Sequence, residues 1–268
     1  MKIRYNPYPL FISNPSPVGI YARKKWLGQE QTPHWKVDFQ KAAQALLAGQ
    51  SPDGSWRGSI VETVRRLFGL HLTIREPNQL VDTALDWLIE RALCVKTGRS
   101  IPREDLGGGR LHSIPFTPGG FDLFVAGATL FLSNAFGRAH DTDVLGLYEW
   151  LSHRAVVKGH QPPGWSSTNN ILRALVVHPL YSHHPATNKL VVRLSRVQQE
   201  SGRWIQAVPL YQTVNALAHL DSEAAARQVH RAFRYLTETQ HPGGTWGRKE
   251  GEWATFLVVH ALRKKGML

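Results

Sequence analysis

Apolar positions along the chain recur with the spacing of a helix. Four segments each contain a Thr, an apolar residue four positions later and a Leu seven positions later. Steps of four and seven place the three side chains on one stripe of an α-helix. The pattern therefore predicts four helices that bury the same kind of face. The four sets are Thr63/Leu67/Leu70, Thr168/Leu172/Leu175, Thr213/Leu217/Leu220 and Thr255/Val259/Leu262.

A turn motif precedes these helices. Its three full copies read Gln-x3-Gly-x-Trp, and a worn copy ends at Trp165. Gly lets the chain turn sharply out of a helix end, and Trp supplies a large apolar surface. The Gln amide can bond backbone groups left unpaired at adjoining helix ends. The motif predicts a repeated unit of helix, turn and helix. The copies are Gln50–Trp56, Gln198–Trp204, Gln240–Trp246 and the worn His160–Trp165.

These turns resemble the QW repeats of squalene–hopene cyclases and related terpenoid cyclases, and also the repeats of protein prenyltransferase β subunits. The resemblance covers the chain from about residue 34 onward. It implies an all-α fold, a single α/α toroid of about five to six helical hairpins. In such a toroid, inner and outer rings of helices surround a central, largely apolar cavity. The turns are scaffold, so the resemblance is specific for the fold and weak for the reaction.

The remaining periodicity predicts helices that alternate between two layers, with residues 1–33 as an extended arm and residues 34–268 as the toroid domain. A short helix is expected within residues 17–28 of the arm. Outer helices are expected at 35–49, 78–96, 141–157, 185–199 and 222–239. Inner helices are expected at 58–73, 121–136, 167–178, 207–220 and 252–265.

Residues 97–120 interrupt this alternation with a long, Gly-rich segment. Loops of this length without secondary structure are often functional, but the sequence does not indicate the role of this one. The helix expected after it, 121–136, is apolar almost throughout, which predicts that it is buried on all sides.

Composition limits where the protein acts. Apolar residues make up 42% of the 268, enough for a core. Cys94 is the single cysteine, which excludes a disulfide framework and suits a reducing compartment. We find no run of apolar residues long enough for a membrane span and no signal peptide pattern. We therefore expect a cytoplasmic protein.

The net charge of +12 suits an acidic partner, such as nucleic acid, anionic lipid or a phosphorylated ligand. The basic excess is spread along the chain in short clusters, and no nucleic-acid-binding motif is present. We expect no specific nucleic-acid partner. A hydrophobic or anionic small molecule and a peripheral membrane contact both remain open, and no pattern indicates an oligomeric state.

The resemblance also implies chemistry that this chain lacks. Cyclases of this kind use an Asp-x-Asp-Asp acid motif, and the nearest string is Asp141-Thr-Asp143-Val144 at the start of a predicted outer helix. An N-cap role is expected there. Prenyltransferases hold zinc with Asp, Cys and His, but Cys94 ends an outer helix, in the wrong ring. We expect no metal and no other cofactor.

Three acids at inner-helix starts are the candidate catalytic residues: Glu62, Asp122 and Glu252. If the ring closes, Glu62 and Glu252 become neighbours, and a close pair would separate their pKa values into an acid and a base. The structural alternative is also plain. Acids in a first turn favour the helix dipole, Asp122 suits an N-cap, and Glu62 can pair with Arg66.

Further side chains are candidates for ligand binding. Basic and polar groups could hold an anionic group such as a diphosphate, and Trp residues could line an apolar pocket, although aromatics at this spacing also suit a core. The candidates are Arg66, His112, Trp165, Arg173, Tyr211 and Trp253.

Three functions follow. The first is an enzyme or carrier that binds or transforms a hydrophobic, isoprenoid-like ligand in the central cavity. The second is a carbohydrate-active α/α-barrel hydrolase or lyase that uses the same acids. The third is a non-catalytic scaffold whose cavity is filled by its own side chains. An open apolar cavity would favour the first, and a polar groove with Trp platforms the second.

Overall fold

The described part of the chain consists of helices joined by turns and loops. The computed structural model describes residues 3–101, 114–117, 119–156, 163–247 and 251–268. Within these ranges it contains eleven α-helices and no β-strand, apart from one isolated backbone bridge between Gln198 and Trp204. The predicted all-α class is therefore confirmed for the described residues.

Every predicted helix is present, with ends within four residues of the expected ones. The helices of the expected outer layer are α2 (Pro33–Leu47), α4 (Gln79–Lys96), α6 (Thr142–Val156), α8 (Pro185–Ser195) and α10 (Glu223–Glu238). Those of the expected inner layer are α3 (Ile60–Leu72), α5 (Phe121–Ala135), α7 (Trp165–Leu175), α9 (Leu210–Leu217) and α11 (Gly251–Lys264). The short helix expected in the N-terminal arm is α1 (Pro17–Lys25). Short 3-10 helices occupy Tyr8–Leu10 and Tyr181–His183.

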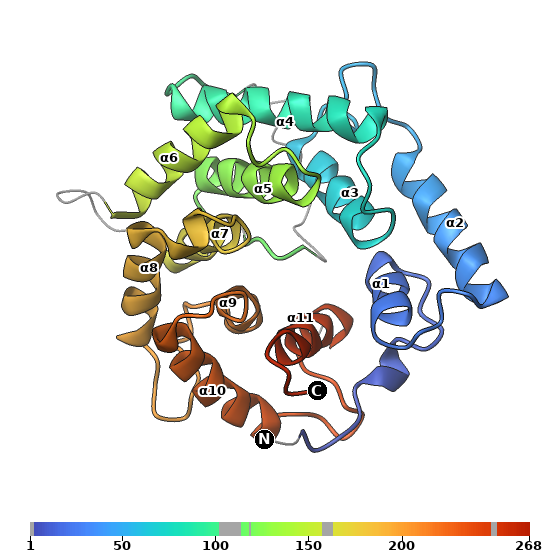
Figure 1. Ribbon diagram of the computed structural model, residues 1–268, viewed down its shortest axis with the longest axis vertical. Helices are drawn as coiled ribbons and strands as arrows, with labels where there is room; N and C mark the ends of the chain where they lie inside the picture. Colours follow the sequence, from blue (N-terminus) through green and yellow to red (C-terminus); the bar gives the residue numbers. More distant parts are fainter. Residues whose placement is uncertain (1–2, 102–113, 118, 157–162, 248–250) are drawn as a thin grey trace.

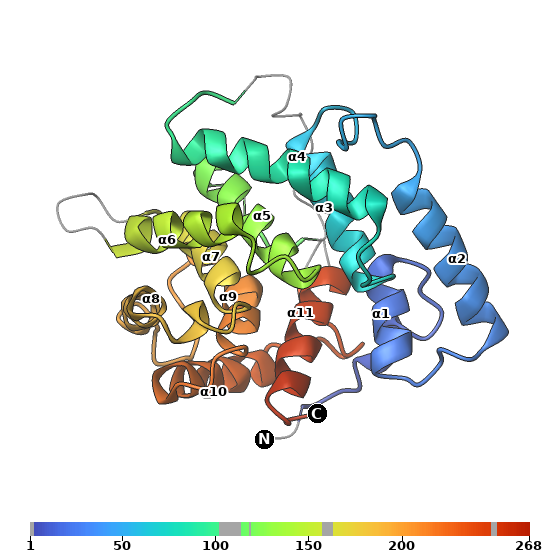
Figure 2. The same cartoon turned by 45° about the horizontal axis from the view of Figure 1, so that its top comes forward.

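The two sets of helices surround a common centre (Figures 1 and 2). In the inner set, each of α3, α5, α7, α9 and α11 packs against the next, and α1 packs against both α11 and α3. The inner helices therefore form a closed cycle of contacts. The outer helices α4, α6, α8 and α10 pack in sequence around it, and α2 packs on α1 and α3.

The Gln of each turn motif joins that turn to the next element of the outer layer. Gln198 Nε2 donates to the carbonyl of Gly202 in its own turn at 2.9 Å and to the carbonyl of Gln228 in α10 at 2.9 Å. Gly202 has φ of 92°, and a Cβ there would lie 2.1 Å from the carbonyl oxygen of Arg231. Only Gly allows this approach. Gln50 repeats the arrangement with Gly54 and Leu80 of α4.

The last copy of the motif joins the N-terminal segment to the turn between α10 and α11. Gln240 Nε2 donates to Tyr5 O at 2.9 Å, and its Oε1 accepts from the backbone N–H groups of Arg4 and Tyr5. A Cβ at Gly244 would lie 2.1 Å from the carbonyl oxygen of Asn6. The N-terminal segment thus contacts the Gln240 turn in the way that α4 contacts the Gln50 turn and α10 contacts the Gln198 turn. The division at residue 33 stays a prediction.

In two of the helical stripes, the Thr helps to hold the Trp of the turn motif before it. The Trp56 N–H donates to Thr63 Oγ1 at 3.0 Å, and the Trp246 N–H donates to Thr255 Oγ1 at 2.9 Å. Trp56, Trp204 and Trp246 are each 1% exposed. The Thr side of these helices therefore faces the turn motifs and the surrounding core. A different face of each inner helix points to the common centre.

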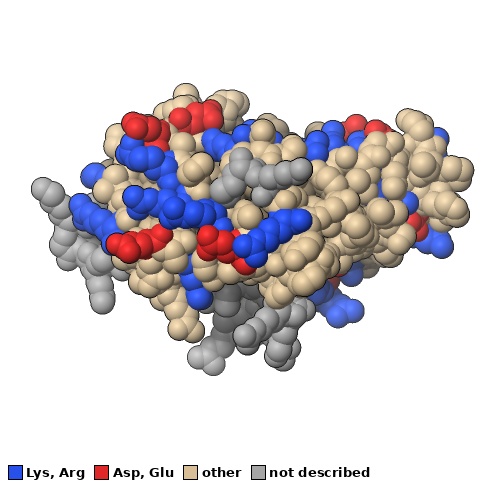
Figure 3. Space-filling view, turned by 90° about the horizontal axis from the view of Figure 1, so that it is seen from below, with Lys and Arg blue, Asp and Glu red and all other residues tan. Residues whose placement is uncertain are grey.

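Charged side chains of both signs share the surface. On the face seen in Figure 3, Lys and Arg side chains lie among Asp and Glu side chains and large uncharged areas. None of the described helices combines the length and apolar character that crossing a membrane requires.

The Gln240 contacts predict a specific loss of stability. Gln240→Ala removes four hydrogen bonds, one to Arg4, two to Tyr5 and one to Gly244, each of which contributes about 1 kcal/mol. We expect the free energy of unfolding to fall by about 4 kcal/mol and amide exchange at residues 4 and 5 to accelerate. Denaturant unfolding and hydrogen exchange measure both effects. Gln206→Ala, at an exposed position, is the control. Unchanged exchange at residues 4 and 5 in Gln240→Ala would contradict this account of the closure.

Candidate functional site

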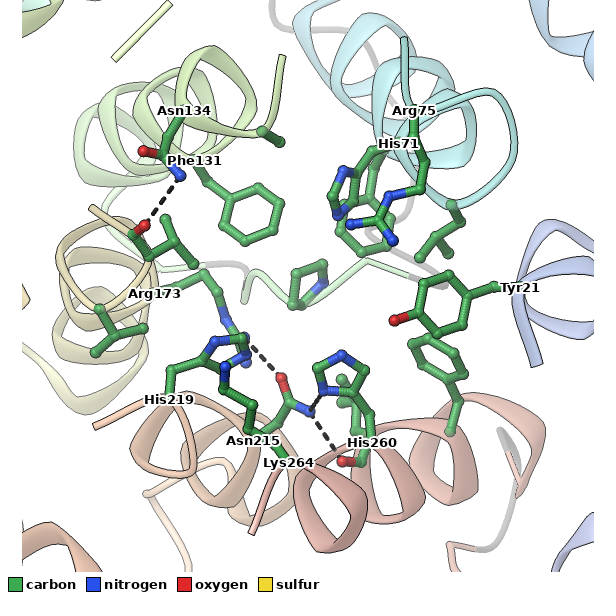
Figure 4. A pocket seen from close by; sticks show the side chains of 18 of the residues that line it. Tyr21, His71, Arg75, Phe131, Asn134, Arg173, Asn215, His219, His260 and Lys264 are labelled. Atoms are coloured by element: carbon green, nitrogen blue, oxygen red, sulfur yellow. Dashed lines mark hydrogen bonds between the residues drawn. The ribbon is translucent and has the colours of Figure 1, made fainter. Parts of the chain in front are cut away.

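A cavity of about 440 Å³ lies at the centre of the inner helices (Figure 4). Its described lining comes from α1, α3, α5, α7, α9 and α11, from residues that follow some of these helices, and from Pro115 ahead of α5. This volume is typical of small-molecule sites, which measure about 300–1,000 Å³. The cavity is therefore the first candidate for a functional site.

The described part of the lining is basic. Arg173 of α7, Arg75 just after α3 and Lys264 at the end of α11 all line the cavity. None of the described lining residues carries a carboxylate. Arg75 and Lys264 lie at C-terminal ends of helices, where the helix dipole favours a positive charge. The charged side chains of the described lining are therefore all positive.

Arg173 is the most deeply buried of these cations, with 2% of its surface exposed. Its Nη1 donates to Asn215 Oδ1 at 2.7 Å, and its Nη2 donates to the carbonyl of Gln212 at 3.0 Å. Its Nε is buried and has no hydrogen-bond partner among the described residues. Burial lowers the pKa of Arg173 to about 9, so the side chain still carries its charge at neutral pH.

Three histidines share the cavity wall. Burial lowers the pKa of His71 to about 3 and that of His260 to about 4, with nearby positive charges such as Arg75 adding to both shifts. Burial, followed by the charge of Arg173, also holds the pKa of His219 well below its ordinary value. All three rings are only half-buried by surface area, because they open onto the cavity. They are neutral at neutral pH and can donate or accept hydrogen bonds.

The proton of His260 is placed by its neighbours. Because Arg173 donates to Asn215 Oδ1, the Asn215 amide nitrogen faces the carbonyl of Leu257 at 2.9 Å and His260 Nδ1 at 3.3 Å. An amide nitrogen only donates, so Nδ1 of the neutral ring accepts and Nε2 carries the proton. His260 therefore provides the cavity with a hydrogen-bond donor, as Arg173 also does.

One wall of the cavity is aromatic. Phe68 meets Trp253 edge-on with ring centroids 5.8 Å apart, and Trp253 stacks on Phe256 at 5.5 Å. Phe131 packs against Phe68 at 5.8 Å. All four line the cavity. The space thus combines an apolar wall with a group of hydrogen-bond donors and positive charges.

Of the predicted ligand-binding residues, Arg173 and Trp253 line the cavity and three others do not. Arg66 donates instead to the carbonyls of Ala45, Leu46 and Ala48, and so caps the C-terminal end of α2. The ring of Trp165 lies under the Arg193 guanidinium, 4.2 Å from it. Tyr211 lies in the first turn of α9, away from the cavity lining. His112 lies outside the described residues.

The three predicted catalytic acids do not line the central cavity. Burial raises the pKa of Glu62, but a hydrogen bond from Arg66 at 2.8 Å and the charges of Arg65 and Arg66 outweigh burial, so the net pKa is lowered. Glu252 accepts a hydrogen bond from Ser16. Asp122 is exposed in the first turn of α5. The roles of these residues as acid or base stay predictions.

Glu62 and Glu252 nevertheless line one and the same space. Both line a second space of about 460 Å³ between α1, α2 and α3, which we call the outer pocket. Asp141 and Asp143 lie elsewhere, beside Arg138 at the start of α6, where Asp141 accepts from Arg138 Nε at 2.7 Å. Among the described residues, no cluster of His, Cys, Asp or Glu is arranged to hold a metal ion.

Sequence reasoning missed most of the cavity. Phe68, Arg173 and His260 share one register, five positions after the repeat Thr, and all three line the cavity. In the remaining stripe the same register holds Ala218, which is not among the described lining residues, so the stripes alone point to only part of the cavity. The lining residues that were missed include Tyr21, His71, Arg75, Asn215, His219, His260 and Lys264.

The lowered histidine pKa values predict a loss of stability in acid. The unfolded chain protonates histidine near pH 6.5, whereas folded His260 stays neutral down to about pH 4. Stability is therefore fully present above pH 6.5 and is lost as the pH falls. Discounting for water in the cavity, we expect His260→Gln to lose about 1 kcal/mol less than the wild type between pH 7.5 and pH 5.

Denaturant unfolding at the two pH values measures this difference. His34→Gln, at an exposed position on α2, is the matched control and should follow the wild type. Equal losses in His260→Gln and in the wild type would show that His260 is not held neutral.

A search of curated proteins found similarity to a terpenoid cyclase. The chain is 30% identical over 162 residues to the ent-copalyl diphosphate synthase of Streptomyces sp. (strain KO-3988). The match covers 56% of this chain and 31% of that enzyme. The chain therefore spans about a third of the length of the curated relative it matches, and the similarity indicates a terpenoid-cyclase-like relationship.

Comparison with solved structures supports the fold. A protein from Actinoplanes superposes with a TM-score of 0.60 at 16% sequence identity, and the match covers 96% of this chain and 90% of that one. At this identity the likeness concerns the fold alone. No family model matches the sequence.

Proposed function

We propose that this protein binds an isoprenoid-like molecule with an anionic diphosphate head in its central cavity. The observation that carries the proposal is Arg173, a buried cation with an unpartnered Nε and no carboxylate beside it in the described lining. A charge taken out of water is costly unless it is paired. An anionic head group would supply the missing partner.

The surrounding groups suit a diphosphate in particular. Arg and Lys side chains make short, strong hydrogen bonds to phosphate oxygens, and Arg75, Arg173 and Lys264 all line the space. His260 adds a neutral donor through Nε2. Several donors spread over the cavity match a group with many acceptor oxygens better than a single carboxylate.

The aromatic wall suits the rest of the ligand. Phe68, Phe131, Trp253 and Phe256 present ring faces and edges to the same cavity. Such surfaces bind branched, apolar chains by burial of hydrophobic area. The similarity to a protein named ent-copalyl diphosphate synthase supports the same ligand class, an isoprenoid diphosphate.

We further propose that the fold is the α/α toroid of the terpenoid cyclase and prenyltransferase scaffold, in a cytoplasmic protein. The closed cycle of inner-helix contacts supports this architecture. Five pairs of outer and inner helices, with α1 as an additional inner helix, fit the expected hairpin count. Contact with a membrane surface, from which such a ligand would be taken up, belongs to the same proposal.

We favour binding over cyclisation started by proton transfer. Protonating an alkene requires a strong acid, and the described lining offers neutral histidines and cations but no carboxyl group. A carbohydrate hydrolase is disfavoured because Glu62, Asp122 and Glu252 lie outside the cavity. A scaffold filled by its own side chains is disfavoured by a space of about 440 Å³.

Calorimetric titration with farnesyl diphosphate tests this function. We expect the diphosphate to bind and farnesol, which has the same chain without the anion, to bind much more weakly. Lys264→Gln should weaken the diphosphate about tenfold, since one charge-assisted hydrogen bond contributes about 1.5 kcal/mol. The same variant should leave the binding of farnesol unchanged.

Lys41→Gln, an exposed substitution on α2, controls for the loss of one positive charge from the surface. Equal affinities for farnesol and farnesyl diphosphate would exclude an anion site. No binding of either compound would reject the ligand class.

A further inference from the structure

We infer that the apolar tail of the ligand passes from the central cavity into the outer pocket, so that the protein takes long isoprenoid chains. This inference rests on the proposed function and adds the length of the chain. Three features support it. The two spaces have lining residues in common, the outer pocket is largely apolar, and the basic residues of the cavity would place the tail of the ligand beside Phe68.

Two side chains line both spaces. Phe68 and Leu72, one helical turn apart on α3, belong to the lining of the central cavity and of the outer pocket. Both are nearly buried, at 4% and 5% exposed. In our proposal, a change of rotamer at these two side chains opens the passage between the spaces. Joining the spaces would roughly double the volume available to a ligand.

The outer pocket exists because small residues occupy its walls. Ala42 and Ala45 of α2 line it, and Gly69 of α3 lets Leu46 approach, since a Cβ at Gly69 would lie 2.6 Å from Leu46 Cδ2. Only Trp35 and Ala43 of α2 are buried. Helix α2 therefore covers the pocket loosely, at the edge of the molecule (Figures 1 and 2).

The charged groups of the outer pocket are already satisfied. Glu62 pairs with Arg65 and Arg66, and Glu252 accepts from Ser16. A second anionic head would meet these two carboxylates, whereas none of the described residues of the cavity lining carries one. The remaining surface is largely apolar, with Val18, Ala42, Ala45 and Leu46 among its residues. An apolar tail is the occupant that this lining fits.

The geometry of α3 gives the tail its direction. Arg75 follows the C-terminal end of α3, and Phe68 lies four residues before Leu72, the last residue of the helix, which is about 6 Å along the helix axis. A head group bound near Arg75 and Arg173 places the start of the tail against Phe68. A short chain ends within the cavity, whereas a longer one reaches the partition and the outer pocket behind it.

The test is a series of diphosphates of increasing chain length: geranyl, farnesyl and geranylgeranyl diphosphate. Titration of the wild-type protein should show affinity rising through the series to geranylgeranyl diphosphate. Ala42→Trp, which fills the outer pocket, should weaken geranylgeranyl diphosphate about tenfold or more because buried chain is expelled. The same variant should leave geranyl diphosphate unchanged.

Gln40→Trp places the same side chain at an exposed position of α2 outside the pocket lining and should match the wild type. Ala42→Leu is a milder filling variant, for use if Ala42→Trp does not fold, and should shift the series in the same direction. Thermal unfolding establishes which variants are folded.

Two results would overturn the inference. One is equal wild-type affinity for geranyl and geranylgeranyl diphosphate. The other is an equal loss for every chain length in Ala42→Trp. Both would leave the head-group site intact, because all three diphosphates would still bind better than farnesol. Failure of all three diphosphates to bind the wild type would instead reject the proposed function.

Discussion

This architecture depends on the hydrogen bonds made by the side-chain amide of the glutamine in each Gln-x3-Gly-x-Trp turn. Gln50, Gln198 and Gln240 each bond the carbonyl of their own turn and a backbone carbonyl of the next outer element. At Gln240 that element is the N-terminal segment, so one amide holds together the two ends of the chain. Neutral hydrogen bonds of this kind contribute little singly. Their importance is geometric, because they fix how far each hairpin turns from the last.

A closed set of inner helices has a physical consequence at its centre. The described side chains there leave a space of about 440 Å³ that is lined by Arg173, neutral histidines and aromatic rings. Arg173 donates to the Asn215 amide oxygen, so the Asn215 amide nitrogen donates to His260 Nδ1 and leaves the proton of the neutral His260 ring on Nε2. A site with donors on one side and rings on the other is prepared for a molecule that is anionic at one end and apolar at the other.

The helices could be predicted from sequence because their signals are local. The Thr63 and Thr255 stripes, the Gly202 turn and the buried Trp204 all lie within one repeat, and each has the structural role that its chemistry suggests. The cavity depends instead on which face of each inner helix meets the centre, which no single repeat encodes. Glu62 was favoured because it begins an inner helix, but the described cavity lies toward the other ends of most of these helices. Arg173 was found through its charge, whereas His260 was missed because its neighbours come from α7 and α9.

The most direct measurement is a crystal structure of the protein with geranylgeranyl diphosphate bound. Our account predicts that the diphosphate lies within hydrogen-bond distance of Arg173 Nε and of Lys264, with the chain running along Phe68 and Trp253. Diphosphate density on the outer surface, with the cavity around Arg173 holding only water, would contradict it.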